Sequence, residues 1–273
     1  MRFVALLLFL PLAACAQFQP GLMRANGAAY PVVVPAGATS YSSLEQQTGW
    51  SGDSTASVSG AYAPMICEMT PGVGNPCPGA GTTTGGTYTG GGGSSTMTLT
   101  TQGVSGKWSG WMAKITQSTT CGQYHMLLTA TYQFDAVAGI QAWEVGRRAT
   151  DCNGITDNGQ TQLVPISGGM LEADIVPSGT SGGWADTGCR FSTFVTSTLN
   201  TENIYYIRDT NGALSVKYIE LNGVTCPIPA SLQHIAGASL GWSNNEFVAA
   251  FQPDANTTGG TFDALVTMTV RTW

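Results

Sequence analysis

The chain has 273 residues, of which only 10% are charged, and its 10 basic and 16 acidic side chains give a net charge of −6. This low charge excludes a coiled coil and a charged disordered tail. The acidic balance excludes a nucleic-acid-binding protein, which needs a basic surface. The length suits one large hydrophobic core with short additional segments.

Residues 1–16 have the pattern of a secretion signal, in which a basic residue precedes a short apolar run and a small-residue exit. The exit has two interpretations. Residues 14–16 form an A-x-A site with cleavage before Gln17, whereas residues 12–15 (LAAC) match a bacterial lipobox that leaves a lipid anchor on Cys15. Both interpretations predict an extracellular, periplasmic or outer-membrane-associated protein. No later run of 18 apolar residues follows, so we predict no transmembrane segment.

The chain has seven cysteines, and removing Cys15 with the signal leaves an even number. In an exported chain this predicts up to three disulfides. The six residues are Cys67, Cys77, Cys121, Cys152, Cys189 and Cys226. Cys67 and Cys77 flank a Pro/Gly segment, which favours a local pair. No close C-x-x-C spacing occurs, so we predict no zinc site and no cofactor.

Two segments have the composition of irregular structure. Residues 17–39 are rich in Pro, Ala and Gly and are expected to form an extended leader. Residues 72–93 hold ten Gly and five Thr, a density that neither a helix nor a central strand tolerates. We therefore predict a long loop there, within a single domain over residues 40–273.

From Thr96 onward the hydrophobic pattern alternates with the period of a β-strand. Leu128, Ala130, Tyr132 and Phe134 alternate with polar residues, and Phe262, Ala264, Val266, Met268 and Val270 do the same in the last run. Further strand-like runs cover residues 140–145, 203–208, 213–221 and 247–252.

Turn signals separate these runs. Asn-Gly pairs at 211–212 and 222–223 predict tight hairpins, and residues 230–238 are the best candidate for a short helix. We expect some ten to fourteen strands from Thr96 on. The fold class is therefore all-β, as a two-sheet antiparallel β-sandwich.

Several segments resemble concanavalin A-like, laminin-G-type jelly-roll domains of exported bacterial proteins. They are SLEQQTGW at 43–50, GIQAWEV at 139–145, WADTGC at 184–189, LSVKYIELNG at 214–223 and the closing strand from Phe262. The resemblance covers about residues 40–273 and implies a jelly-roll sandwich. It also implies that Cys152 pairs with Cys189, which leaves Cys121 for Cys226. The family includes lectins, adhesion modules, glycoside hydrolases and polysaccharide lyases, so the fold does not choose a function.

Glu144 is the first candidate for catalysis. If Trp143 and Val145 face the core, strand parity puts Glu144 on the opposite face, where an apolar context raises the pKa of a general acid. The alternative is an acid paired with a neighbouring arginine or facing water. Glu246 is the candidate second carboxylate.

Two other acids, Glu172 and Asp174, share a strand face by their i, i+2 spacing. The E-x-D-x-E signature of jelly-roll glucanases is absent from the sequence, which weakens the prediction of an enzyme.

Binding needs less than catalysis, because aromatic rings with polar neighbours suffice to hold a sugar. The predicted ligand-binding residues are Trp184, Asp186, Trp242, Asn244 and Asn245. Residues 151–157 (DCNGITD) are the loop where a Ca²⁺ ion would be sought.

Three functions remain open. The first is an exported module that binds a polysaccharide or surface glycan without catalysis. The second is a glycoside hydrolase or polysaccharide lyase that uses Glu144 as acid/base, where a lyase would need a Tyr/His/Arg constellation. The third is a structural or adhesion lipoprotein of the cell envelope.

Overall fold

The structure is a computed structural model that describes most of the strand-forming sequence. The described residues are 23–25, 28–41, 62–69, 86–91, 94–101, 108–116, 124–134, 140–150, 155–157, 161–176, 184–192, 194–208, 214–233, 238–239, 246–255 and 260–273. The chain divides into two units, Met1–Pro31 and Val32–Trp273. The first contains the hairpin of β1 (Met23–Ala25) and β2 (Ala28–Tyr30).

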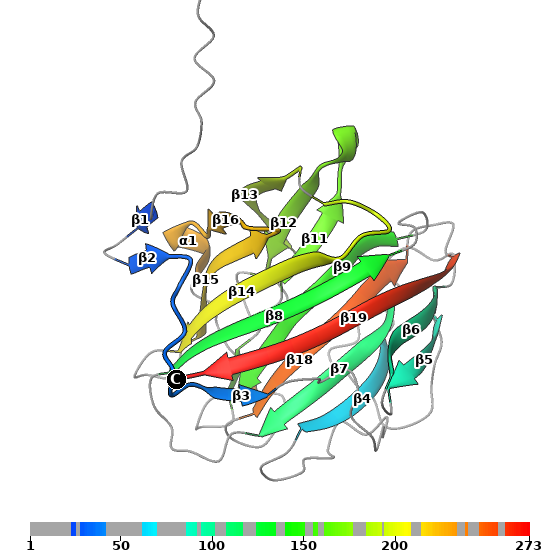
Figure 1. Ribbon diagram of the computed structural model, residues 1–273, viewed down its shortest axis with the longest axis horizontal. Coiled ribbons are helices and arrows are strands. Elements are labelled where there is room, and N and C mark those ends of the chain that lie inside the picture. Colours follow the sequence, from blue (N-terminus) through cyan, green and yellow to red (C-terminus); the bar gives the residue numbers. More distant parts are fainter. Residues whose placement is uncertain are drawn as a thin grey trace, which may run out of the picture. The chain divides into compact units, whose positions relative to one another are not determined.

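The second unit is built from two antiparallel sheets, which form two layers in Figure 1. The β8 sheet has the order β16-β15-β14-β8-β19-β6-β5, with β3 also paired to β19. Its strands are β3 (Thr39–Tyr41), β5 (Gly86–Gly91), β6 (Ser94–Thr101), β8 (Tyr124–Phe134), β14 (Asn200–Arg208), β15 (Leu214–Leu221), β16 (Val224–Pro227) and β19 (Gly260–Thr272).

The β9 sheet has the order β13-β12-β11-β9-β18-β7-β4, with β10 paired to β9 and β17 paired to β10. Its strands are β4 (Tyr62–Met69), β7 (Trp108–Thr116), β9 (Ile140–Thr150), β10 (Ile155–Asp157), β11 (Thr161–Pro165), β12 (Leu171–Ile175), β13 (Ala185–Phe191), β17 (Ala238–Ser239) and β18 (Glu246–Ala255). The described helical turns are η2 (Ser167–Gly169) and α1 (Ala230–Gln233).

This arrangement confirms the predicted all-β jelly-roll sandwich. From β6 to β19 the described residues contain 14 strands, the upper end of the expected range. Both predicted hairpins are present, since β14 pairs with β15 and β15 with β16. In the second turn Asn222 and Gly223 have φ angles of 50° and 81°, the left-handed backbone that an Asn-Gly hairpin requires.

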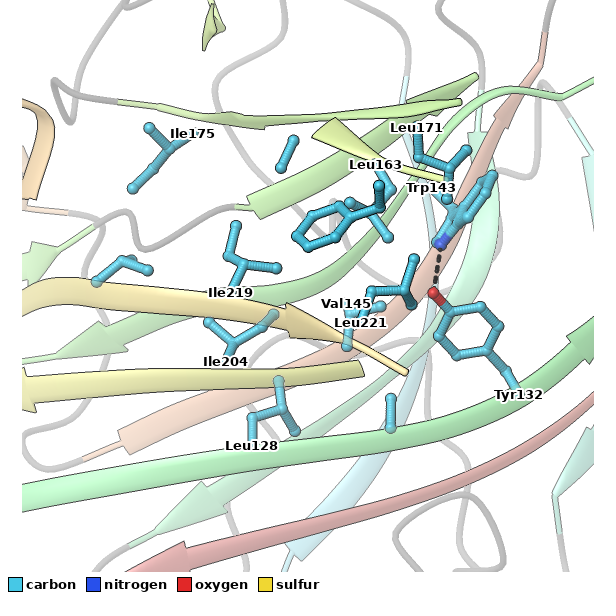
Figure 2. Packing of buried hydrophobic residues seen from close by; sticks show 14 of the residues in the cluster. Leu128, Tyr132, Trp143, Val145, Leu163, Leu171, Ile175, Ile204, Ile219 and Leu221 are labelled. Carbon is cyan, nitrogen blue, oxygen red and sulfur yellow. Dashed lines mark hydrogen bonds between the residues drawn. The ribbon is translucent and has the colours of Figure 1, made fainter. Parts of the chain in front are cut away.

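The two sheets enclose one hydrophobic core (Figure 2). On β8, Leu128, Ala130, Tyr132 and Phe134 are all fully buried, as the alternation predicts. Trp143 faces them from the other sheet, and its Nε1 donates a hydrogen bond to the Tyr132 hydroxyl over 3.1 Å. The aromatic residues therefore connect the sheets by a directional contact as well as by packing.

A carboxyl group lies within this core. Glu202 is 1% exposed, and its Oε2 accepts a hydrogen bond of 2.8 Å from the Tyr132 hydroxyl. Burial disfavours the charged form and raises the pKa of Glu202 to about 8, although the bond from Tyr132 opposes the shift. The core thus contains a proton-binding group that sequence periodicity did not mark.

The disulfide pattern corrects two expectations. Cys189 on β13 is bonded to Cys226 on β16, with 5.8 Å between the Cα atoms. The pairings Cys152–Cys189 and Cys121–Cys226 are therefore wrong. The first was implied by the family resemblance and the second was the pair that remained. In the structure the bonded cysteines lie on β13 and β16, which are edge strands of different sheets. The proposed partner of Cys67, Cys77, lies outside the described residues, as do Cys121 and Cys152.

The Gly-rich segment also differs in part from the prediction. Residues 86–91 form β5, so the loop assigned to 72–93 is wrong for this stretch. β5 is an edge strand that pairs only with β6 in the sheet order, and an edge position tolerates Gly better than a central one because fewer neighbours depend on it. Residues 72–85 and 92–93 lie outside the described part.

Candidate functional site

The outer face of the β9 sheet carries a row of polar side chains on neighbouring strands. Glu144 on β9 is opposite Gln162 on β11, Gln162 is opposite Asp174 on β12, and Asp174 is opposite Asp186 on β13. We call these four residues the β9-sheet row. Trp143, Leu163 and Ala173 are chain neighbours of row residues and are buried in the core. Because side chains alternate along a strand, the row lies on the other face of the sheet.

Glu144 has the position predicted from parity, because Trp143 and Val145 are both fully buried on the core side. Its side chain is nevertheless only 4% exposed. Gln252 of β18 lies opposite Glu144, and Glu246 begins the same strand six residues earlier. At about 3.3 Å per residue these six residues span roughly 20 Å, so the backbone register does not bring Glu246 beside Glu144.

Asp174 is held between its neighbours and is 7% exposed. Gln162 Nε2 donates a hydrogen bond of 3.0 Å to Asp174 Oδ2. Asp174 Oδ1 is buried and has no hydrogen-bond partner. A buried acceptor without a donor is uncommon in proteins, because it has lost its hydration without replacement.

The row ends in an acidic cluster that consists of Glu172, Asp174 and Asp186. One carboxylate oxygen of each residue lies within 4.8 Å of the others. Arg190 on β13 approaches two of them, with 2.6 Å from its Nη2 to Glu172 Oε2 and 2.7 Å to Asp186 Oδ2. Three carboxylates face one guanidinium, which leaves a formal charge of −2 when all are ionised.

The members of the cluster titrate differently. Arg190, and then the backbone N–H of Gly188, hydrogen-bond to Asp186 and hold the pKa of its carboxyl at about 2. Desolvation, and then the charge of Asp174, raise the pKa of Glu172. When Glu172 and Asp174 are both ionised, neither oxygen can donate, so their contact is repulsive. A proton on Glu172 would convert it into a hydrogen bond.

Trp184 directly precedes β13 and is half-buried, and Asp186 and Arg190 are exposed on that strand. The structure therefore brings Trp184 and Asp186 of the predicted ligand set into one segment with the acidic cluster. Trp242, Asn244 and Asn245 lie outside the described residues. In the predicted calcium loop, residues 151–154 also lie outside, and Ile155–Asp157 form β10.

Sequence reasoning missed a second polar cluster, on the β8 sheet. His125 Nδ1 lies 2.5 Å from the Tyr205 hydroxyl, and both rings stack with Trp273 at 5.6 and 6.1 Å between centroids. Desolvation lowers the pKa of His125, which favours the neutral imidazole. Tyr205 is only 4% exposed, whereas His125 and Trp273 are half-buried. No local signal predicts the cluster, because His125 and Tyr205 are 80 residues apart and Trp273 lies still further along the chain.

A shallow depression of about 280 Å³ lies elsewhere, between the β11–β12 turn and the segment from Phe194 to Thr196. Its walls are mostly apolar, including Ile166, Met170 and Val195, and no titratable side chain lines it. It is therefore separate from the groups that could bind or transform a polar ligand.

The two sheets, joined across one core with the polar row outside, define the fold. It is a jelly-roll β-sandwich. No known protein-family model matches the sequence, and no curated protein sequence matches it.

Solved structures with a similar arrangement include three carbohydrate-related proteins. The endo-1,3-β-glucanase from Streptomyces sioyaensis is 14% identical over 88% of this chain and 98% of that one, with a TM-score of 0.40. The alginate lyase vAL-1 from Chlorella virus is 12% identical over 67% and 88%, with a TM-score of 0.42. The Emp46p carbohydrate recognition domain is 11% identical over 68% and 85%, with a TM-score of 0.38. At this level the likeness concerns the sandwich alone and assigns no ligand.

Proposed function

We propose that this protein is an exported module that binds a polysaccharide or another surface polymer, without catalysis, at the β13 edge of the β9 sheet. The observation that carries the proposal is that three side chains at this edge reach solvent: Trp184 is half-buried, and Asp186 and Arg190 are exposed. An aromatic face packs against the apolar side of a sugar ring, and the charged groups hydrogen-bond to hydroxyls. An edge strand offers these groups to a long chain without a closed pocket.

Burial of the acids supports binding over catalysis. A general acid or base must come within hydrogen-bond reach of the reacting oxygen. Glu144 and Asp174 are 4% and 7% exposed, whereas the groups on β13 reach solvent. The accessible chemistry of the β9-sheet row is therefore at its β13 end.

The test is binding to a polysaccharide panel by affinity gel electrophoresis. We expect Trp184→Ala to weaken binding to the retained polymer at least about tenfold, which corresponds to the loss of one aromatic contact. Trp273→Ala is the matched control, because Trp273 is also half-buried but belongs to the β8 sheet. Equal binding by wild type and Trp184→Ala, or no binding to any polymer, would contradict the proposal.

One observation favours a second candidate, a glycoside hydrolase or lyase that uses Glu144 as acid/base. Glu144 and Asp174 are separated by one strand, which puts their backbones roughly 9.5 Å apart. Side chains that start from backbones at this spacing can hold two carboxyl groups at the separation of about 6.5–9.5 Å that inverting glycosidases use. Release of reducing or unsaturated ends from a bound polymer, abolished in Glu144→Gln and retained in Glu220→Gln, would establish this candidate over the first.

Export is the second part of the proposal. The Cys189–Cys226 disulfide is typical of an oxidising compartment, and the pattern of residues 1–16 is typical of a secretion signal. Among the described residues, no helix is long and apolar enough to cross a bilayer. Mass spectrometry of the mature N-terminus separates the remaining alternatives: a free Gln17 indicates release, and a diacylated Cys15 indicates an envelope lipoprotein.

A further inference from the structure

The acidic cluster contains a buried carboxylate oxygen to which no group of the described residues donates a hydrogen bond. Asp174 is more than nine-tenths buried, and its Oδ1 has no hydrogen-bond partner. Its Oδ2 is occupied by Gln162 from β11, on one side of β12. The cluster partners include Asp186 from β13, on the other side of β12. The Asp174 carboxylate therefore lies between the Gln162 amide, which donates to Oδ2, and the carboxylates of Glu172 and Asp186, while its Oδ1 has no donor.

Arg190 compensates only part of this charge. Its guanidinium makes hydrogen bonds of 2.8 and 2.7 Å to the two oxygens of Asp186 and approaches Glu172. No hydrogen bond joins it to Asp174 among the interactions of the described residues. With Arg190 counted, the cluster retains a charge of −2, which equals the charge that one divalent cation would neutralise.

We infer that Glu172, Asp174 and Asp186 form a binding site for a calcium ion on the outer face of the β9 sheet. All the donors are carboxylate oxygens, the hard ligands that Ca²⁺ and Mg²⁺ take in proteins. Glu172 and Asp186 are partly open to solvent, with side-chain exposures of 23% and 48%, so an ion has a path to the site and room for water ligands.

The coordination chemistry of the two ions favours Ca²⁺ at this cluster. At a Ca–O distance of about 2.3–2.6 Å, oxygens on opposite sides of the ion are about 4.6–5.2 Å apart. One oxygen of each residue lies within 4.8 Å of the others, so all three can reach one Ca²⁺ ion. Mg²⁺ demands a near-ideal octahedron at about 2.0–2.1 Å and gives up its water ligands reluctantly, whereas Ca²⁺ accepts a flexible geometry, which suits carboxylates fixed on two strands.

The site differs in place from residues 151–157, where the sequence suggested calcium, and its test needs no polymer. The purified full-length chain is stripped with EDTA and titrated with CaCl₂ or MgCl₂ by calorimetry and thermal unfolding. We expect a Kd for Ca²⁺ of about 10⁻⁴–10⁻³ M, as in extracellular modules, and a rise in Tm of about 3–5 °C at ten times Kd. Mg²⁺ should give less than half of this rise.

Two variants remove the site in different ways. Asp174→Asn keeps the size of the side chain and an acceptor for Gln162 but removes the charge. Asp186→Asn also keeps the size of the side chain and removes one charge. Its position is exposed, so we expect little effect on folding. Both should lose the Ca²⁺-dependent rise in Tm. Glu220→Gln is the matched control, because Glu220 is equally buried at 8% exposed but lies on the β8 sheet with both oxygens hydrogen-bonded.

The inference is overturned if Ca²⁺ leaves the wild-type Tm unchanged, or if both aspartate variants retain the wild-type shift. Because the titration contains the ion alone, its failure leaves polymer binding by Trp184 untouched. Conversely, a calcium response in a protein that binds no polymer would contradict the proposed function and retain the ion site.

Discussion

The outer faces of the two sheets carry similar rows of polar residues, but only in one row does every carboxylate oxygen accept a hydrogen bond from a neighbour. On the β8 sheet, Thr129 donates to Asn203, Asn203 donates to Glu220 Oε1, and Thr225 donates to Glu220 Oε2, each over 2.7 Å. These four residues, one on each of four neighbouring strands, form the β8-sheet row. Its one carboxylate has two donors.

The β9-sheet row contains more acids than donors. Gln162 supplies one hydrogen bond to Asp174, and Arg190 supplies the cation for Glu172 and Asp186. Asp174 Oδ1 is left without a donor. The contrast shows how the same architecture can either close a polar network or leave it open to a ligand. A row in which every polar group is hydrogen-bonded adds stability, whereas a row with an unpaired carboxylate oxygen keeps a group that can bind a ligand.

Glu202 is a carboxyl group in the core between the two rows, and its removal should have the largest pH-dependent effect. The pKa of Glu202 is raised to about 8 in the folded chain, from 4.5. The folded state therefore binds one more proton than the unfolded state between these values, and the free energy of unfolding falls as pH rises through the window. The fall is complete above about pH 8, and its size is on the order of 5 kcal/mol.

Glu202→Gln should abolish that slope, because the amide resembles the protonated acid and cannot ionise. Urea unfolding from pH 5 to 9 measures it: the variant should match wild type near pH 5 and exceed it in stability near pH 9. An identical pH dependence in Glu202→Gln and wild type would contradict the raised pKa of Glu202.

The disulfide joins the edge strands that carry the ends of both rows, since Cys226 follows Thr225 on β16 and Cys189 lies on β13 with Asp186. Replacing both cysteines by Ala should lower the free energy of unfolding by about 3–4 kcal/mol, the loop entropy expected for the 37-residue separation. Guanidinium unfolding of the double variant measures this. A loss below about 1 kcal/mol would indicate that the edges are held by packing alone.

The direct contrast between the rows predicts opposite signs for two charge-removing substitutions. In EDTA, Glu220→Gln should destabilise by about 1–3 kcal/mol. Asn203 and Thr225 each donate to one oxygen of the carboxylate, and the amide keeps only one of these two acceptor oxygens. Asp174→Asn should be neutral or stabilising by up to about 1 kcal/mol, since its NH₂ group can donate to Glu172 and one repulsion disappears. Chemical unfolding at pH 7 checks both, and equal losses would remove the contrast.

The smallest expected effect concerns the turn that brings Thr225 to Glu220. Gly223 has φ of 81°, a conformation that costs an L-residue about 1 kcal/mol. Gly223→Ala should lower stability by that amount although a Cβ there meets no atom within 4 Å. Gly37→Ala is the control, because Gly37 has equal space and no left-handed φ, and it should stay within about 0.5 kcal/mol of wild type.

The strands that the sequence predicted best are those with one face in the core. Leu128 to Phe134 alternate in sequence and in burial, and the Asn222-Gly223 turn has the backbone that its residues require. Such features depend on neighbours within a few residues, so period and turn chemistry determine them. The position of Glu144 between buried Trp143 and Val145 follows from the same parity.

The candidate site could be predicted only in part for the same reason. Glu172 and Asp174 share a face by local spacing, but their approach to Asp186 depends on β12 pairing with β13 across an irregular register. The expected pairings of Cys189 and Cys226 failed because the pairing of edge strands from opposite sheets has no local signature.

By itself, then, the low-charge sequence determined an all-β chain, the inward face of its central strands, and the turns between them. Only the tertiary structure decided that Cys189 meets Cys226, that Glu202 is enclosed beside Tyr132, and that the acids of three strands form one row. The physical reason is that alternation is a property of one strand. Register and strand order come from the free energy of burying all the strands in one core.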